Sequence, residues 1–187
     1  MPYDAPDLAK LNLSEIAALA AARKLPPVEN WDPKHIGESE MRIAADGKWY
    51  HQGDEIRRPA MIRAFSSLLQ CDAEGQHWLV TPQQKLSIDV EDAPFIAVEM
   101  QSEGEFESRC LAFRLNTDDL VVAGPDSELA FRNDLPYLHV RKGLWAKIAR
   151  SAYYELAEIA LAECPEEPKK YGARAWHFRS APPNDVD

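Results

Sequence analysis

Short apolar stretches interrupted by turns constrain the fold of this chain more than any other feature of its sequence. Between residues 95 and 141, five such stretches lie close together, and Gly, Pro, Asp or Asn residues separate them. These strand candidates are 95–102, 108–116, 120–123, 128–132 and 137–141. Strands this short and this closely spaced predict a strongly bent sheet in the second half of the chain.

A helix is predicted to follow this sheet and to cap it. The stretch from Gly143 to about Glu163 carries apolar residues at three- and four-residue spacing and ends before Pro165. The apolar positions are Leu144, Ile148, Ala152, Leu156 and Ile159. The remaining residues, 165–187, are rich in proline and charge, and their aromatic residues predict that part of this tail docks on the body.

The first half of the chain is predicted to form a smaller unit of strands, one helix and further strands. Asp46-Gly47 is a dipeptide that supplies positive φ in a two-residue hairpin turn, so a short strand is expected on either side of it. An amphipathic helix of about 12 residues is predicted from Pro59. Residues 28–40 show no periodicity and are interpreted as an extended connector. The strand candidates of this unit are 41–45, 48–51, 77–81 and 85–90.

These elements predict an α+β fold of two small β-rich domains. A helix over 14–24, which Pro26-Pro27 would stop, is expected to form a short N-terminal arm. The predicted boundaries are 1–24 for the arm, 25–92 for an N-terminal α+β domain and 93–187 for a C-terminal domain with its tail. Both halves place a predicted helix directly after basic residues, but no residue-level repeat aligns, so the sequence leaves a duplication open.

The overall charge and the cysteines exclude several classes of protein. The chain has 31 acidic and 21 basic residues, and its net charge of −10 repels nucleic-acid phosphates, so neither DNA nor RNA is an expected partner. Three widely spaced cysteines without a C-x-x-C motif predict neither disulfides nor a zinc cage. Asp4 and Asp7 stand where a signal peptide would carry basic residues, and no apolar run approaches the ~20 residues that a membrane span needs. We therefore expect a cytoplasmic protein without membrane insertion.

Two windows break the acidic trend, and both cover the predicted start of a helix. Residues 56–71 hold three arginines, residues 135–154 hold four basic residues, and neither window contains an acid. Cations near a helix N-terminus are unfavourable unless an anion neutralises them, and such positions are typical of phosphate or carboxylate sites. The predicted anion site comprises Arg58, Arg141, Lys142 and Arg150. In the alternative interpretation, these cations pair with carboxylates at the domain junction and latch the two halves together; the carboxylates are Asp89, Glu91 and Asp92.

No catalytic residue, metal site or cofactor is predicted. The chain lacks a glycine-flanked nucleophile, its eight glycines never cluster into a phosphate loop, and the acidic run at 89–92 lacks the frame of a calcium loop. His51 and His139 stand alone on predicted strands, where histidines usually pack or form hydrogen bonds. Three tryptophans either fill a core or stack on a planar ligand: Trp49, Trp78 and Trp145.

Motifs spread over about residues 25–161 give the chain a resemblance to a known family. They are Pro26-Pro27 with Trp31-x-Pro33, Asp46-Gly47-x-Trp49-x-His51-x-Gly53 with Ile56-x-Arg58, Phe65, Val80-Thr81-Pro82, Val90-Glu91-Asp92-Ala93-Pro94-Phe95, and Tyr137-x-x-x-Arg141-x-Gly143-Leu144-x-Ala146-x-x-x-Arg150. With these motifs, the chain resembles the bacterial family DUF1285, whose function is unknown. The resemblance implies a duplicated two-domain core with a pleckstrin-homology-like C-terminal half. It also implies a site for a nucleotide-like ligand at the domain interface and a role in signal transduction.

The favoured hypothesis is a regulatory or signalling module that binds a small anionic, nucleotide-like molecule in a cleft between its domains. Arg58, Arg141, Arg150 and Tyr153 would face Thr81, Glu91 and Asp92, and Trp49 and His51 would complete the ligand-binding set. One alternative is a protein-interaction adaptor that uses a sheet edge or groove and needs no small molecule. The other is a hydrolase in which the carboxylates at 89–92 hold magnesium.

Overall fold

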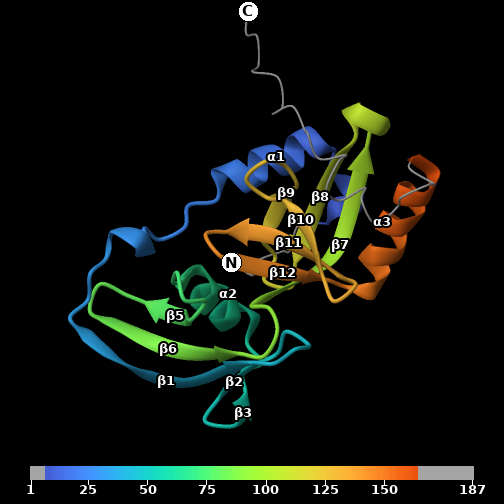
Figure 1. Cartoon of the computed structure of the whole chain (residues 1–187). Helices are drawn as coiled ribbons and strands as arrows, with labels where there is room; N and C mark the ends of the chain where they lie inside the picture. Colours follow the sequence, from blue (N-terminus) through green and yellow to red (C-terminus); the bar gives the residue numbers. More distant parts are fainter. Residues whose placement is uncertain (1–6, 164–187) are drawn as a thin grey trace, which may run out of the picture.

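The structure is a computed structural model that describes residues 7–163 and shows two β-sheets of six strands each (Figure 1). The first sheet consists of β1 (His35–Ile43), β2 (Trp49–His51), β3 (Asp54–Glu55), β4 (Leu69–Cys71), β5 (His77–Val80) and β6 (Gln84–Val90). The second consists of β7 (Phe95–Glu103), β8 (Cys110–Leu115), β9 (Leu120–Val122), β10 (Leu129–Arg132), β11 (Leu135–Arg141) and β12 (Leu144–Ile148). The helices are η1 (Leu8–Lys10), α1 (Leu13–Ala22), η2 (Val28–Asn30), α2 (Pro59–Ser67), η3 (Phe106–Ser108) and α3 (Arg150–Glu163). The predicted fold class is therefore confirmed: the chain forms two β-rich domains, and a C-terminal helix packs on the second.

The two sheets have the same topology. Their strand orders are β3-β2-β1-β6-β5-β4 and β10-β11-β12-β7-β8-β9. In each sheet the first and last strands of the domain pair in parallel at the centre, and two further strands continue antiparallel on either side. The connections differ, because α2 lies between the third and fourth strands of the first sheet, whereas a short loop joins β9 to β10. This shared topology supports the duplication that the sequence left open.

The stretch predicted as the first part of the C-terminal helix is instead strand β12, so that prediction is wrong. Leu144, Ala146 and Ile148 are buried, and the two residues between them are only partly covered, which is the period of a strand. Leu144 and Ile148 are four residues apart, a spacing that places two side chains on one face of a strand as well as of a helix. The helix begins at Arg150, so Arg141 ends β11 and Lys142 lies in the tight β11–β12 turn, and neither is at a helix N-terminus.

Two further expectations from the first half are also wrong. Residues 35–40, interpreted as connector, belong to β1, which pairs in parallel with β6 from His35 onward. Ile36 is 65% exposed and a bulge forms at Glu40, so the alternation that marks a strand is hidden there. Helix α2 is nine residues long, shorter than predicted, because Leu69 already pairs with Leu79 in the sheet. The predicted docking of the tail concerns residues outside those described.

One continuous core joins the two domains. Trp49 is fully buried and stacks on Phe65 of α2 at 6.4 Å between ring centroids, and both belong to the same apolar cluster as Phe95 and Phe113 of the second sheet. Figure 1 shows α2 lying between the first sheet and the second domain. The interface between the domains is therefore a packed layer, and α2 is its central element.

The N-terminal arm packs on the second domain, although the first sheet is the next sheet along the chain. Helix α1 lies against β8 and β9, where Leu8, Leu13 and Ile16 form with Ala112 a small apolar cluster separate from the main core. No helix within residues 7–163 is long and apolar enough to cross a membrane.

Candidate functional site

Arg58 and Arg141, the two arginines expected to share a cleft, contact opposite ends of helix α2. Arg58 is the exposed N-cap residue of α2, and its side chain makes no capping hydrogen bond. Arg141 reaches the other end, where its Nη2 donates to the Ser66 carbonyl oxygen at 2.7 Å. A helix of nine residues separates its ends by roughly 12 Å, so the two guanidiniums belong to different surroundings.

The other residues of the predicted ligand set are also dispersed. Thr81 lies in the β5–β6 turn, where its hydroxyl accepts from the Gln84 amide at 3.1 Å. His51 is exposed at the end of β2, and Arg150 is exposed at the start of α3. Tyr153 is partly buried against the core, and Trp49 is buried completely, so its ring presents no surface to a ligand.

Glu91 and Asp92 are each held by basic partners. Glu91 pairs with Arg42 and accepts from the Ala45 amide at 3.0 Å. These hydrogen bonds hold the pKa of Glu91 below its ordinary value, the amide of Ala45 having the larger effect. Asp92 accepts from Lys147 Nζ at 2.6 Å and from the Tyr137 hydroxyl at 2.7 Å. Burial alone would raise the pKa of Asp92, but these two donors hold it below its ordinary value.

An aromatic and basic face surrounds Asp92 on the second sheet. The guanidinium of Arg132 lies 4.3 Å from the ring centroid of Trp145 and 5.2 Å from that of Tyr137. His139 meets the Trp145 ring edge-on at 5.0 Å, and its Nδ1 lies 2.8 Å from the Asp126 carbonyl oxygen. Burial and the Asp92 carboxylate raise the pKa of Tyr137 to about 12, so its hydroxyl is a persistent donor at neutral pH.

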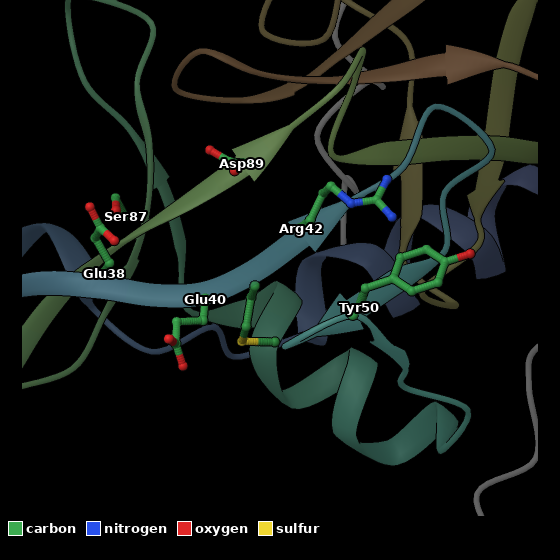
Figure 2. Close-up of a pocket in the computed structure, with 8 residues that line it drawn as sticks. Glu38, Glu40, Arg42, Tyr50, Ser87 and Asp89 are labelled. Atoms are coloured by element: carbon green, nitrogen blue, oxygen red, sulfur yellow. The ribbon is translucent and has the colours of Figure 1, made fainter.

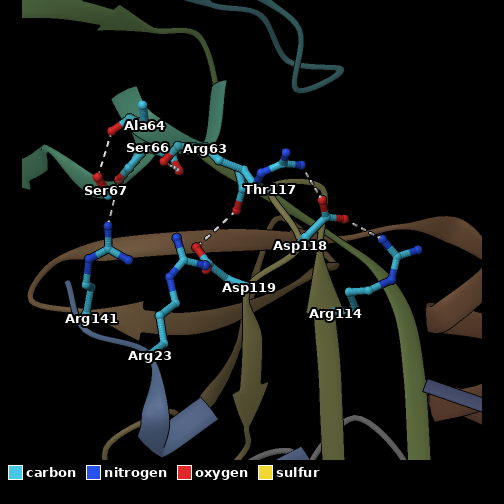
Figure 3. A network of polar contacts seen from close by, with 10 residues as sticks. All are labelled: Arg23, Arg63, Ala64, Ser66, Ser67, Arg114, Thr117, Asp118, Asp119 and Arg141. Atoms are coloured by element: carbon cyan, nitrogen blue, oxygen red, sulfur yellow. Dashed lines mark hydrogen bonds and ion pairs between the residues drawn. The ribbon is translucent and has the colours of Figure 1, made fainter. Parts of the chain in front are cut away.

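A second polar cluster, which the sequence did not predict, lies between α2 and the β8–β9 turn (Figure 3). Asp118 accepts from Arg63 of α2 at 2.8 Å and from Arg114 of β8 at 3.0 Å. The neighbouring Asp119 pairs with Arg23, the residue that ends α1. The turn therefore binds three parts of the chain through two carboxylates: the arm, the N-terminal domain and its own strand.

Arg141 completes this cluster from β11 and is its least neutralised member. In Figure 3 its side chain lies beside that of Arg23, and both point toward the end of α2. Burial and the nearby charge of Arg23 lower the pKa of Arg141 to about 10, and Glu29 opposes this shift only in part. The nearby Glu29 pairs with Lys142, and within residues 7–163 Arg141 forms no ion pair with a carboxylate. Arg141 contacts the Ser66 carbonyl and the face of Phe95. We call the guanidiniums of Arg23 and Arg141 the arginine pair.

A pocket of about 320 Å³ lies elsewhere, on the face of the first sheet that α2 does not cover (Figure 2). Its lining residues are Glu38, Glu40, Met41, Arg42, Tyr50, Gly53, Ser87 and Asp89. Arg42, its one basic side chain, already lies over the Tyr50 ring at 4.5 Å and pairs with Glu91. With three carboxylates in its wall, this pocket repels anions.

The carboxylates of the acidic run do not converge. Glu91 and Asp92 are turned to different partners, and Asp89 lines the pocket on the first sheet. Within the described part of the chain, no three His, Cys, Asp or Glu side chains form a group that could hold a metal ion.

The arginine cluster was missed because its members are far apart in sequence. Arg23 lies in the sequence near the end of the predicted arm helix, and Arg63 is one of the three arginines in the window 56–71. The signal that could have been used is Thr117-Asp118-Asp119, three polar residues between two strand candidates. Such a turn often binds side chains, but its partners could not be named from sequence.

Comparison with known proteins assigns both halves of the chain. Residues 26–93 match the model described as "Domain of unknown function (DUF1285), N-terminal domain", and residues 94–179 match "Protein of unknown function (DUF1285), C-terminal domain". A DUF1285 family protein from Silicibacter pomeroyi DSS-3 is 41% identical, with a TM-score of 0.67 over 76% of this chain and 82% of that chain. Another from Shewanella baltica OS155 is 26% identical, with a TM-score of 0.53 over 63% of this chain and 90% of that chain. No curated protein matches the chain.

Proposed function

Because the chain belongs to the DUF1285 family, whose two domains are of unknown function, we propose a function from the geometry of their interface: the protein is a regulatory module that binds a small anion at the arginine pair. The observation that carries this proposal is the partly buried Arg141, which lies next to Arg23 and forms no ion pair with a carboxylate within residues 7–163. The hydrolase alternative is not supported, since the carboxylates at 89–92 do not converge.

The charge balance of the cluster supports an anionic ligand. Two like charges held close together and partly out of water are unfavourable, and the lowered pKa of Arg141 reflects that cost. A phosphate or carboxylate group in contact with both guanidiniums would remove it through charge-assisted hydrogen bonds, which planar guanidiniums form in pairs. A nucleotide or another phosphorylated metabolite supplies such a group.

The position of the cluster supports a regulatory role. Arg23 ends the arm, Arg63 belongs to the N-terminal domain, and Arg141 and the β8–β9 turn belong to the C-terminal domain. A ligand that contacts groups from these parts binds one arrangement of them better than others and therefore shifts their equilibrium. We propose that the protein reports the ligand to a partner in this way, in the cytoplasm, where such metabolites occur.

Thermal unfolding against inorganic phosphate, nucleotides, cyclic dinucleotides and sugar phosphates tests the proposal. A compound present at about one hundred times its Kd should stabilise the fold by ~2.7 kcal/mol, or roughly 5 to 10 °C for a chain of this size. The shift should disappear in Arg141→Gln, which keeps a donor for Ser66 but loses the charge, and should persist in Arg57→Gln, whose side chain is 82% exposed. A shift that persists in Arg141→Gln, or no shift with any compound, would overturn the proposal, and the second result would favour the adaptor.

A further inference from the structure

The N-terminal arm is attached to the C-terminal domain by an apolar contact of its own. Leu8, Leu13 and Ile16 pack on Ala112 and on partly buried side chains of β8 and β9, and these residues form a cluster that is separate from the main core. Helix α1 has only ten residues, a length that is marginal for a helix without tertiary contacts. The arm can therefore leave its site while the core of both domains stays intact.

The polar contacts under the arm are incomplete. Glu103 accepts from the Leu13 amide at 3.1 Å, and Gln101 Nε2 donates to the Leu11 carbonyl at 2.7 Å. Gln101 Oε1, however, is buried, and no donor within the described residues reaches it. A buried acceptor without a partner favours the state in which water can reach it, which here is the released arm.

The end of the arm lies in the proposed anion site. Arg23 has left the helical conformation, with φ −69° and ψ 116°, and the chain then runs through Pro26-Pro27 toward the first sheet. Asp119 attracts the Arg23 guanidinium, while the Arg141 guanidinium, which lies beside it in Figure 3, repels it. An anion between the two arginines would turn that repulsion into a bridge, so anion binding and arm docking must favour each other.

We propose that the arm, residues 8–23, is a strap that the anion site controls: it is docked when an anion occupies the arginine pair and is released more often when the pair is empty. The inference deepens the proposed function and rests on it for the nature of the trigger. Release uncovers the apolar face that β8 and β9 present to the arm, formed by Cys110, Ala112, Leu120 and Val122.

Cys110 provides a measurement of strap release that needs no ligand. Its thiol packs against the arm cluster, and burial together with the Glu103 charge raises its pKa. In the full chain carrying Cys71→Ser and Cys164→Ser, Cys110 is the one remaining thiol, and its rate of maleimide labelling reports the open fraction of the arm. Ile16→Ala, which weakens the docked state, should increase the rate and so calibrates the method.

Neutralising Arg141 then tests the coupling. Arg141→Gln removes the charge that repels Arg23, so labelling of Cys110 without ligand should slow by roughly three- to tenfold, whereas Arg57→Gln should leave the rate unchanged. Inorganic phosphate, or a phosphorylated compound that shifts thermal unfolding, should slow labelling of the protein with Arg141 but not of Arg141→Gln. Circular dichroism of each variant confirms that it is folded.

Two results would overturn the proposal that the arm is a strap controlled by the anion site. If Ile16→Ala does not accelerate labelling, the arm does not protect Cys110. If Ile16→Ala accelerates labelling but Arg141→Gln labels at the same rate as the protein with Arg141, the arm moves independently of the arginine pair. Both rates are measured without ligand, so these failures are distinguishable from the failure of the anion-binding proposal, which the thermal shifts decide.

Discussion

Glu91 and Asp92 are neighbours in the chain, yet opposite domains hold their carboxylates. Glu91 pairs with Arg42 of β1 and with the amide of Ala45, whereas Asp92 accepts from Lys147 of β12 and Tyr137 of β11. Through these contacts, the two adjacent residues connect the first sheet to the second at the domain junction.

Loss of the Asp92 contacts should weaken this junction in a pH-dependent way. Asp92→Asn is expected to lower the free energy of unfolding by about 1 kcal/mol at neutral pH, a modest value because the side chain is partly exposed to solvent. The pKa of Asp92 is lowered in the folded state, so its contribution is present above its ordinary value near 4 and is lost as the pH falls through the folded value. Urea unfolding of both proteins from neutral to acid pH measures this. Asp89→Asn, an exposed neighbour, is the control, and an equal effect from it would refute the assignment.

Tyr137 should contribute stability that is lost as the pH rises, the opposite of the Asp92 contribution. Its pKa is raised from 10.0 to about 12 in the folded state, so the folded protein retains a proton that the unfolded chain releases. The stability that this provides is complete below pH 10 and is lost as the pH rises toward 12. Unfolding free energies from about pH 9 upward should fall more steeply for the native sequence than for Tyr137→Phe. Tyr154→Phe, at a 59% exposed position, should follow the native sequence, and identical slopes for all three would contradict the contact with Asp92.

Gly47 is required where the β1–β2 hairpin meets the second domain. It has φ +82°, and a Cβ there would lie 2.7 Å from Ile96 Cγ1 and 2.8 Å from Asn116 Nδ2. Gly47→Ala should therefore lower the melting temperature by more than Gly53→Ala, because Gly53 has a similar φ of +89° but open space around it. We expect the free energy of unfolding to fall by about 1 to 3 kcal/mol more in Gly47→Ala than in Gly53→Ala. Equal losses would mean that the hairpin does not press on the second domain.

Arg63 should contribute to domain attachment through Asp118. The pair is mostly buried, with side chains 21% and 14% exposed, so its removal should cost more than that of a surface ion pair. Arg63→Gln is expected to destabilise the protein by about 1 to 2 kcal/mol and Arg57→Gln by a few tenths. A double-mutant cycle of Arg63→Gln with Asp118→Asn measures the coupling, and a coupling of zero would show that the two side chains act independently.

Local sequence signals predicted much of the fold. Asp46-Gly47 marks its turn because only a few residue types tolerate positive φ, and the strands from Phe95 to Arg132 follow from turn residues between apolar stretches. Leu144 and Ile148 were assigned to a helix because their spacing fits both periodicities, and only their pairing with β11 and β7 decides for a strand.

The candidate site was less accessible to sequence reasoning. Arg141 breaks the acidic trend of the sequence, but it does not lie at a helix N-terminus, because α3 begins only at Arg150. The position of Arg141 beside Arg23 depends on how the arm crosses the domain interface, and no local sequence pattern predicts that path. The same holds for Asp118 and Asp119, whose partners come from three elements.

The most direct test of the central claim is to locate a bound oxyanion crystallographically. Tungstate is tetrahedral and doubly charged like phosphate, and its anomalous scattering identifies it without ambiguity. Crystals of the native sequence soaked in tungstate should show an anomalous peak in contact with the guanidiniums of Arg23 and Arg141, and crystals of Arg141→Gln should lack it. Tungstate bound only elsewhere, or a peak that persists at the pair in Arg141→Gln, would contradict the claim that the arginine pair is the anion site of this protein.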